Sequence, residues 1–250
     1  MSGHSKWATT KHQKGAKDKA RGKLFAKLIR QLEVAAREGG GDLTANANLR
    51  TMYQKARDAS VPVDTIDRAI KRGTGELEGV RYEAVSYEGY APCGVAVIVE
   101  CLTDNRNRTG AEIRSVFSRN GGSMAEPGAV AGQFARKGVV AVPRSTDEEA
   151  IMAAALDAGA QDLRDEGNEW TLVCEPGDLH VLQAALAAAA IPIDSAESQW
   201  LPTTTVEVAD ATGAHKVLHL LDLLEDHDDV QLVAANFDIP DEIFDAVSES

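Results

Sequence analysis

The fold is decided by residues 88–122, EGYAPCGVAVIVECLTDNRNRTGAEIRSVFSRNGG. Residues 86–90 and 95–102 are rich in β-branched and aromatic side chains and flank an Ala-Pro-Cys-Gly turn, which predicts two neighbouring strands. Residues 109–119 predict a helix, and residues 129–134 predict another strand after two glycine-containing turns. The stretch therefore predicts a β-β-α-β unit that needs further helices and strands to bury both of its faces.

A second unit follows, and its pattern indicates an insertion. It predicts alternating strands and helices at 139–142, 147–158, 170–174, 179–190 and 194–199. A strand, a helix and a strand then follow at 206–208, 215–224 and 230–234. The segments on either side of the insertion each make only half of a sheet-and-helix layer. We therefore expect residues 79–134 and 203–250 to form one discontinuous α+β domain, with residues 135–202 inserted as another.

The N-terminal segment predicts a small helical domain over residues 1–78. Apolar residues recur at helical spacing between residues 24 and 36, and the glycines at 39–41 end that helix. A second helix is expected over residues 44–59, and Asp64 is expected to cap a third. The predicted fold class is thus α+β, with a three-helix domain followed by two sheet-and-helix domains, one inserted into the other.

The charge of the chain is strongly segregated. The formal net charge is −13, but residues 1–75 hold 16 Lys+Arg and 7 Asp+Glu, while the remainder holds 10 and 32. Such asymmetry is typical of a basic nucleic-acid-binding segment on an acidic body. The three cysteines form no CxxC pair, and no signal-peptide pattern or membrane-length apolar run is present, so a cytoplasmic protein without membrane contact is expected.

The strongest functional signal is the basic segment at the N-terminus. Residues 1–30 contain nine Lys and Arg side chains and a single acid, Asp18. Each cation that meets a phosphate releases counterions, so affinity should fall with salt, with a log–log slope of about −0.9 per duplex phosphate or about −0.7 per single-strand phosphate. Trp7 offers a ring on which an unpaired base could stack. The predicted nucleic-acid-binding residues of this arm are His4, Lys6, Trp7, Lys11, His12, Lys14, Lys17, Arg21, Lys23 and Lys27.

Two interpretations of the arm stay open. If it is helical, Lys11, Lys14, Lys17 and Arg21 fall within about a third of the helix circumference and could follow one phosphate strand. The alternative is a solvated basic tail whose tryptophan docks on the body. A basic arm indicates a polyanionic partner, but it does not distinguish DNA from RNA.

A second candidate site lies between the strand at 95–102 and the helix at 109–119. Here Asn105, Arg106, Asn107 and Arg108 combine two arginines with two amides, which suits contacts to phosphates or base edges. The alternative is a turn in which Asp104 or Thr109 caps the helix and the arginines point into solvent.

No pattern predicts catalysis, a metal or a cofactor. His215 and His219 lie four residues apart, but no acid stands between them as in HExxH, so they are expected to be unpaired surface histidines. The acidic run at 225–229 lacks EF-hand spacing and is expected to be a solvated helix end. There is no P-loop and no GxSxG, and Gly73-Thr74-Gly75 is not a dinucleotide fingerprint.

Five segments, spanning residues 3–239 in order, are typical of one known family. They are GHSKWATTKHQKGAKDKARGKLFAKLIR, RAIKRGTG, YEGYAPCGVAVIVECLTDNRNRT, IRSVFSRNGGSM and LLEDHDDVQLVAANFDI. By these segments the chain resembles the YebC proteins, which include the mitochondrial translational activator of cytochrome c oxidase subunit one. Cys93 departs from the pattern, because such proteins usually carry glycine there.

The resemblance implies a three-domain α+β protein with a basic helical domain and a role in gene expression rather than catalysis. Members of the family are described as probable transcriptional regulators that bind DNA. Others resemble translation factors that act at the ribosome, particularly on proline-rich nascent chains. The resemblance extends to site residues only over the matching arm, residues 4–27, and over residues 105–108.

Three classes of function remain. We favour a regulator that binds RNA at the ribosome, because no DNA-reading helix with Asn, Gln or Arg at its start is evident. A DNA-binding transcriptional regulator is the alternative. An enzyme would need a catalytic pattern that the sequence lacks, and an adaptor would use the acidic body as its protein-binding surface. The sequence predicts no oligomeric state.

Overall fold

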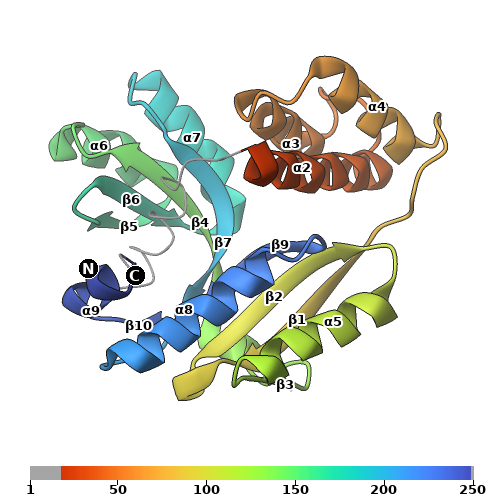
Figure 1. The fold of residues 1–250 in the computed structure, drawn as a ribbon. Coiled ribbons are helices and arrows are strands. Elements are labelled where there is room, and N and C mark those ends of the chain that lie inside the picture. Colours follow the sequence, from red (N-terminus) through yellow and green to blue (C-terminus); the bar gives the residue numbers. More distant parts are fainter. Residues whose placement is uncertain (1–17, 249–250) are drawn as a thin grey trace.

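Three helices open the part of the chain that the structure, a computed structural model, describes, which is residues 18–248 (Figure 1). They are α2 (Asp18–Gly39), α3 (Ala47–Asp58) and α4 (Val63–Thr74). Leu28 and Leu32 of α2 are buried against the other two helices. Gly73 lets α4 cross α2 closely, since a Cβ there would lie 2.5 Å from the carbonyl oxygen of Glu33.

The helix starts differ slightly from those expected. Asn46 caps α3, because its side chain accepts a hydrogen bond from the Leu49 amide and donates to the carbonyls of Ala35 and Gly40. The expected Asp64 cap of α4 is wrong. The helix begins at Val63 after Pro62, so Asp64 lies in its first turn, where its charge favours the helix dipole.

The first sheet is antiparallel and has the order β3-β1-β2-β9. Its core residues come from the central strand β2, buried along nearly its whole length, and from two helices that cover one face (Figure 1). The elements are β1 (Glu83–Tyr90), β2 (Ala96–Thr103), α5 (Arg106–Arg119), β3 (Ser123–Ala125), α8 (Ala211–Glu225) and β9 (Val230–Ala235).

The strand expected at 129–134 is wrong. Residues Ala131–Gln133 form a short 3-10 turn, and the small strand β3 takes the edge of the sheet instead. The carboxylate of Glu88 accepts hydrogen bonds from the amides of Gly128, Val130 and Ala131 at 2.7, 2.7 and 3.0 Å. These amides are thereby occupied and cannot join a ladder.

The inserted domain is a second antiparallel sheet, of order β5-β6-β4-β7, with two helices on one face. The chain enters through β4 and leaves through β7, which pair with each other, so the predicted insertion is confirmed. The strand β5 was not predicted, because AQDLRD is a polar edge strand without an apolar alternation. The elements are β4 (Phe134–Pro143), α6 (Glu148–Ala155), β5 (Ala160–Asp165), β6 (Glu169–Cys174), α7 (Leu179–Ala188) and β7 (Ser195–Pro202).

The two sheets meet through a polar and aromatic junction. Glu100 of β2 accepts hydrogen bonds from Arg136 at 2.6 Å and from the Trp200 indole at 2.8 Å. The chain ends with β8 (Val206–Glu207) paired in parallel with β10 (Phe237–Asp238), then α9 (Asp241–Ser248). Among residues 18–248, no helix has the length and apolar character needed to cross a membrane.

Candidate nucleic-acid interface

Three cations on one side of α2 contact the second domain. Lys23, Lys27 and Arg30 are spaced four and three residues apart, so they share a helix face. Lys23 Nζ donates to the Asp226 carbonyl at 2.8 Å and lies 3.1 Å from the Asp226 carboxylate. Lys27 donates to the carbonyl of Glu225 at 2.9 Å. The last carbonyl groups of a helix have no partner within the helix and carry partial negative charge, so the C-terminal end of α8 binds these cations favourably.

Asp229 lies at the centre of this contact and is buried, with an exposed fraction of 3%. Its carboxylate accepts hydrogen bonds from Arg30 at 3.0 Å, Arg108 at 2.9 Å and Thr109 at 2.7 Å. Burial alone would raise the pKa of Asp229. The hydrogen bonds from Thr109 and Arg108, together with the charges of Arg30 and Arg108, outweigh burial and lower that pKa. Asp229 therefore joins the helical domain to the start of α5.

The segment 105–108 is the first turn of α5 rather than a loop. Asn105 is the cap of the helix, since its side chain accepts a hydrogen bond from the Arg108 amide at 3.1 Å. Arg108 is held by Asp229 and by Asp104, the latter at 2.8 Å. Arg106 and Asn107 are exposed, and their side chains make no hydrogen bond or ion pair with the described residues. Of the four predicted residues, these two are the ones available to a ligand.

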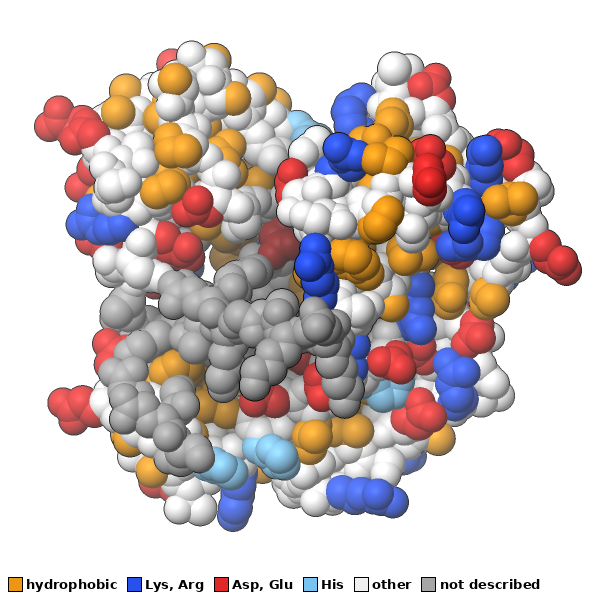
Figure 2. Space-filling model, turned by 45° about the horizontal axis from the view of Figure 1, so that its top comes forward, with side chains coloured by type: hydrophobic (Ala, Val, Ile, Leu, Met, Phe, Trp, Pro, Cys, Tyr) orange, Lys and Arg blue, Asp and Glu red, His pale blue; other side chains and the backbone are white. Residues whose placement is uncertain are grey.

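The helical domain also presents cations that no described acid neutralises. Arg57, Arg68 and Lys71 are exposed and form no ion pair within residues 18–248. Arg68 and Lys71 lie three residues apart and share one side of α4. Arg72 differs, because its guanidinium bonds the buried carboxylate of Glu33 at 2.6 Å. Figure 2 shows Lys and Arg side chains on the lobe formed by these helices.

Comparison with known proteins identifies the family. Residues 5–76 match the TACO1/YebC protein N-terminal domain, and residues 82–237 match the TACO1/YebC second and third domain. The chain belongs to the TACO1/YebC family. A relative from Beutenbergia cavernae, named "Probable transcriptional regulatory protein", is 55% identical over the whole of both chains. One of the same name from Acidothermus cellulolyticus is 56% identical over 97% of this chain and 98% of its own.

A solved structure supports the same conclusion. The crystal structure of a conserved hypothetical protein from Aquifex aeolicus has a TM-score of 0.83 and 45% sequence identity. The match covers 90% of this chain and 93% of that one. The arrangement of a helical domain and two sheet domains is therefore shared with another protein.

Only part of the predicted arm can be placed in this TACO1/YebC chain. Arg21 is exposed, and its guanidinium lies 5.5 Å from the centre of the Phe25 ring. Lys23 and Lys27 contact the 225–229 segment, as described above. The other predicted residues lie outside the described part of the chain; they are His4, Lys6, Trp7, Lys11, His12, Lys14 and Lys17.

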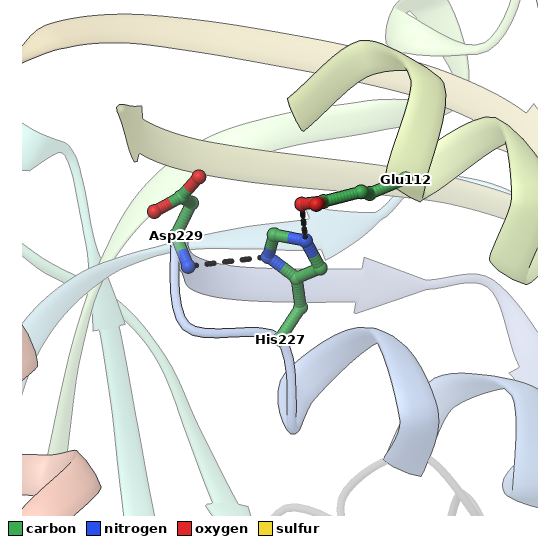
Figure 3. A group of neighbouring side chains, drawn as sticks. All are labelled: Glu112, His227 and Asp229. Atoms are coloured by element: carbon green, nitrogen blue, oxygen red, sulfur yellow. Dashed lines mark hydrogen bonds and ion pairs between the residues drawn. The ribbon is translucent and has the colours of Figure 1, made fainter. Parts of the chain in front are cut away.

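The acidic run of the TACO1/YebC chain at 225–229 is not simply a solvated helix end, because Asp229 is buried and paired. Glu112, His227 and Asp229 also bring three possible metal-ligand atoms within 4.8 Å of one another (Figure 3). However, His227 already bonds Glu112 at 2.8 Å, and its Nδ1 accepts the Asp229 amide at 3.1 Å. With two arginines on Asp229 as well, the group is best interpreted as a structural network. One feature of the sequence could have indicated this network, since the acid Asp229 directly precedes the strand β9.

Proposed function

We propose that this chain is a non-enzymatic, nucleic-acid-binding regulator of gene expression that acts on ribosomal RNA as a translation factor. The observation that carries the proposal is the group of exposed cations on the helical domain that no described acid neutralises. They are Arg57, Arg68 and Lys71, and the basic residues of segment 1–21 precede them. A polyanion would be attracted to this domain and repelled by the acidic body, whose net charge is negative.

The charge on α4 favours RNA over sequence-specific reading of duplex DNA. In a helix-turn-helix protein, the first turn of the second helix enters the major groove. Here the first residues of α4 include exposed Asp64 and Asp67, whose charges would meet the phosphates that flank the groove. The cations Arg68 and Lys71 lie further along the helix. With acids at its start and cations further along, α4 is better suited to contact a phosphate backbone with its side than to insert its N-terminal end into the major groove.

A DNA-binding transcriptional regulator is the second candidate. The observation that favours it is the name of the relatives, "Probable transcriptional regulatory protein". The same cations would serve either polymer, since a phosphate contact carries no sequence information by itself. The two candidate functions therefore differ in the nucleic acid that the chain selects. A test must include both ribosomal RNA and duplex DNA.

The test compares ribosome cosedimentation with duplex-DNA gel shifts at matched salt, using the full chain and a chain lacking residues 1–21. We expect ribosome binding that falls steeply with salt and is lost without the arm. The double variant Arg68→Ala/Lys71→Ala should lower the log–log salt slope by about 1.4, or about 0.7 per phosphate contact. The matched control Arg164→Ala/Lys216→Ala removes the same charge from the body and should leave the slope unchanged.

Two results would count against the proposal. A salt-resistant, sequence-specific shift of duplex DNA without ribosome binding would favour the transcriptional alternative. Ribosome binding that survives deletion of residues 1–21 and the α4 double variant would show that the basic side is not the nucleic-acid interface.

A further inference from the structure

The inserted domain carries an apolar face that no described part of the chain covers. Met152 of α6, Leu156 of the following 3-10 turn (Leu156–Ala158) and Val181 of α7 are 45%, 68% and 56% exposed. These exposures are high for side chains of this size within an otherwise well-packed domain. In Figure 2, hydrophobic side chains gather on the lobe that contains α6 and α7.

The three side chains belong to one end of the helix pair. The two helices pack side by side over the sheet, with Ile151 and Leu182 turned into the core. The turn after Leu156 approaches the start of α7 closely, because a Cβ on Gly159 would lie 3.1 Å from the Cβ of Asp178. Leu156 and Val181 are each three residues from this contact, and Met152 is one helical turn before Leu156. Together they form what we call the α6/α7 apolar face.

The charge of the inserted domain is predominantly negative. Residues 135–202 contain twelve Asp and Glu side chains and four Lys and Arg side chains, and each of these four already forms an ion pair with an acid. Exposed Glu148 and Glu149 lie one turn before Met152, and exposed Asp157 is next to Leu156. A nucleic acid would be repelled here, and so would an acidic protein.

From this combination we infer that the α6/α7 apolar face docks a basic, amphipathic protein segment. Its apolar side chains would cover Met152, Leu156 and Val181, and its Lys or Arg side chains would meet Glu148, Glu149 and Asp157. An apolar centre with a charged rim is the ordinary anatomy of a protein interface, and the rim charges set partner choice. The protein then has two binding sides of opposite character, one for a polyanion and one for a polycation.

The experiment uses a defined probe, a synthetic amphipathic helix of Leu and Lys, LKKLLKLLKKLLKL, titrated into the full chain by calorimetry. The same peptide with Glu in place of Lys is the control ligand. We expect one saturable site for the Lys peptide and no binding of the Glu peptide. The assay contains no nucleic acid, so its outcome is independent of the function proposed above.

Variants locate the site. Leu156→Ser/Val181→Ser should weaken the Lys peptide about tenfold or more, the fold-change that corresponds to losing partial burial of two apolar side chains. The control Val63→Ser/Leu223→Ser makes the same change at two apolar residues on the other domains that are 40% and 36% exposed, and it should stay within about twofold of the parent. Glu148→Gln/Glu149→Gln should weaken binding about threefold at low salt and less at high salt.

Several outcomes would overturn the inference. Equal affinity of the parent and the Leu156→Ser/Val181→Ser variant would do so, as would equal binding of the Glu peptide. If sedimentation equilibrium shows a dimer that Leu156→Ser dissociates, the occupant is a second copy of the chain. If the Lys peptide binds only after residues 1–21 are removed, the occupant is the chain's own basic arm.

Discussion

Cys93 adopts a backbone conformation that suits glycine. In the turn Pro92–Gly94 its φ is 65°, within the left-handed region, and Gly94 follows at 76°. A side chain in this region costs roughly 1–2 kcal/mol, which agrees with the glycine that the family resemblance leads us to expect here. Its thiol is exposed, whereas Cys101 and Cys174 are buried. Burial raises the pKa of Cys101 to about 12, so that thiol is inert at neutral pH.

Replacing Cys93 with glycine should stabilise the protein. We expect Cys93→Gly to increase the free energy of unfolding by about 0.5–1 kcal/mol, because relief of the left-handed strain exceeds the entropic cost of glycine. Urea unfolding at neutral pH measures this change in the free energy of unfolding. Cys93→Ala keeps the strain and should show no gain; an equal gain in both variants would assign the effect to the thiol rather than to the backbone.

The start of α5 combines a structural and a ligand-facing role within one helical turn. Asn105 caps the helix and Arg108 turns inward to Asp229, while Arg106 and Asn107 face outward. The sequence predicts this helix only from residue 109, because the polar residues before Thr109 show no helical spacing of apolar side chains. The cap itself could have been found, since Asn after a strand is a common helix start.

Two variants of Asn105 separate these roles. Asn105→Ala should lower the free energy of unfolding by about 1 kcal/mol, because the Arg108 amide loses its partner. Asn105→Ser keeps a capping acceptor without adding charge and should preserve stability, as followed by thermal unfolding. If Asn105→Ser nevertheless weakens nucleic-acid binding, the Asn105 amide also contacts the ligand; if Asn105→Ala unfolds at the parent temperature, the cap does not contribute to stability.

Polar contacts join the helical domain to the two sheet domains, whereas the sheet domains also share a buried apolar cluster that includes Ile98 and Phe134. The helical domain is held by Lys23, Lys27 and Arg30 against the end of α8, and Lys55 adds an ion pair to Glu197 of the inserted domain at 2.8 Å. Surface ion pairs of this kind are individually weak and are screened by salt. The buried carboxylate of Asp229 is the exception, because it serves two arginines and a hydroxyl group at once.

Asp229→Asn should destabilise the junction at pH 7 by about 1–3 kcal/mol, since Arg30 and Arg108 lose their shared anion. The pKa of Asp229 is lowered in the folded protein, so the unfolded chain binds more protons near pH 4. The stabilisation is therefore complete above the unfolded pKa of about 3.9 and is lost as the pH falls through the lower folded pKa.

Thermal unfolding between pH 3 and pH 7 checks this prediction. The parent and Asp229→Asn should differ at pH 7 and converge towards the acid end. Asp226→Asn is the control, because the Asp226 side chain is 75% exposed and its loss should cost little. Identical curves for the parent and Asp229→Asn at pH 7 would contradict the central role of Asp229.

The sequence by itself determined the three-helix domain, the insertion of one sheet domain into another and the separation of basic from acidic segments. These follow from apolar periodicity, turn residues and composition, which are properties of continuous segments. Only the tertiary structure decided which cations stay available. Lys23 meets Asp226 across 203 positions of the chain, and Arg108 meets Asp229 across 121, whereas Arg68 and Lys71 find no described acid. Pairing depends on what folding brings within hydrogen-bond reach, and local sequence does not contain that information.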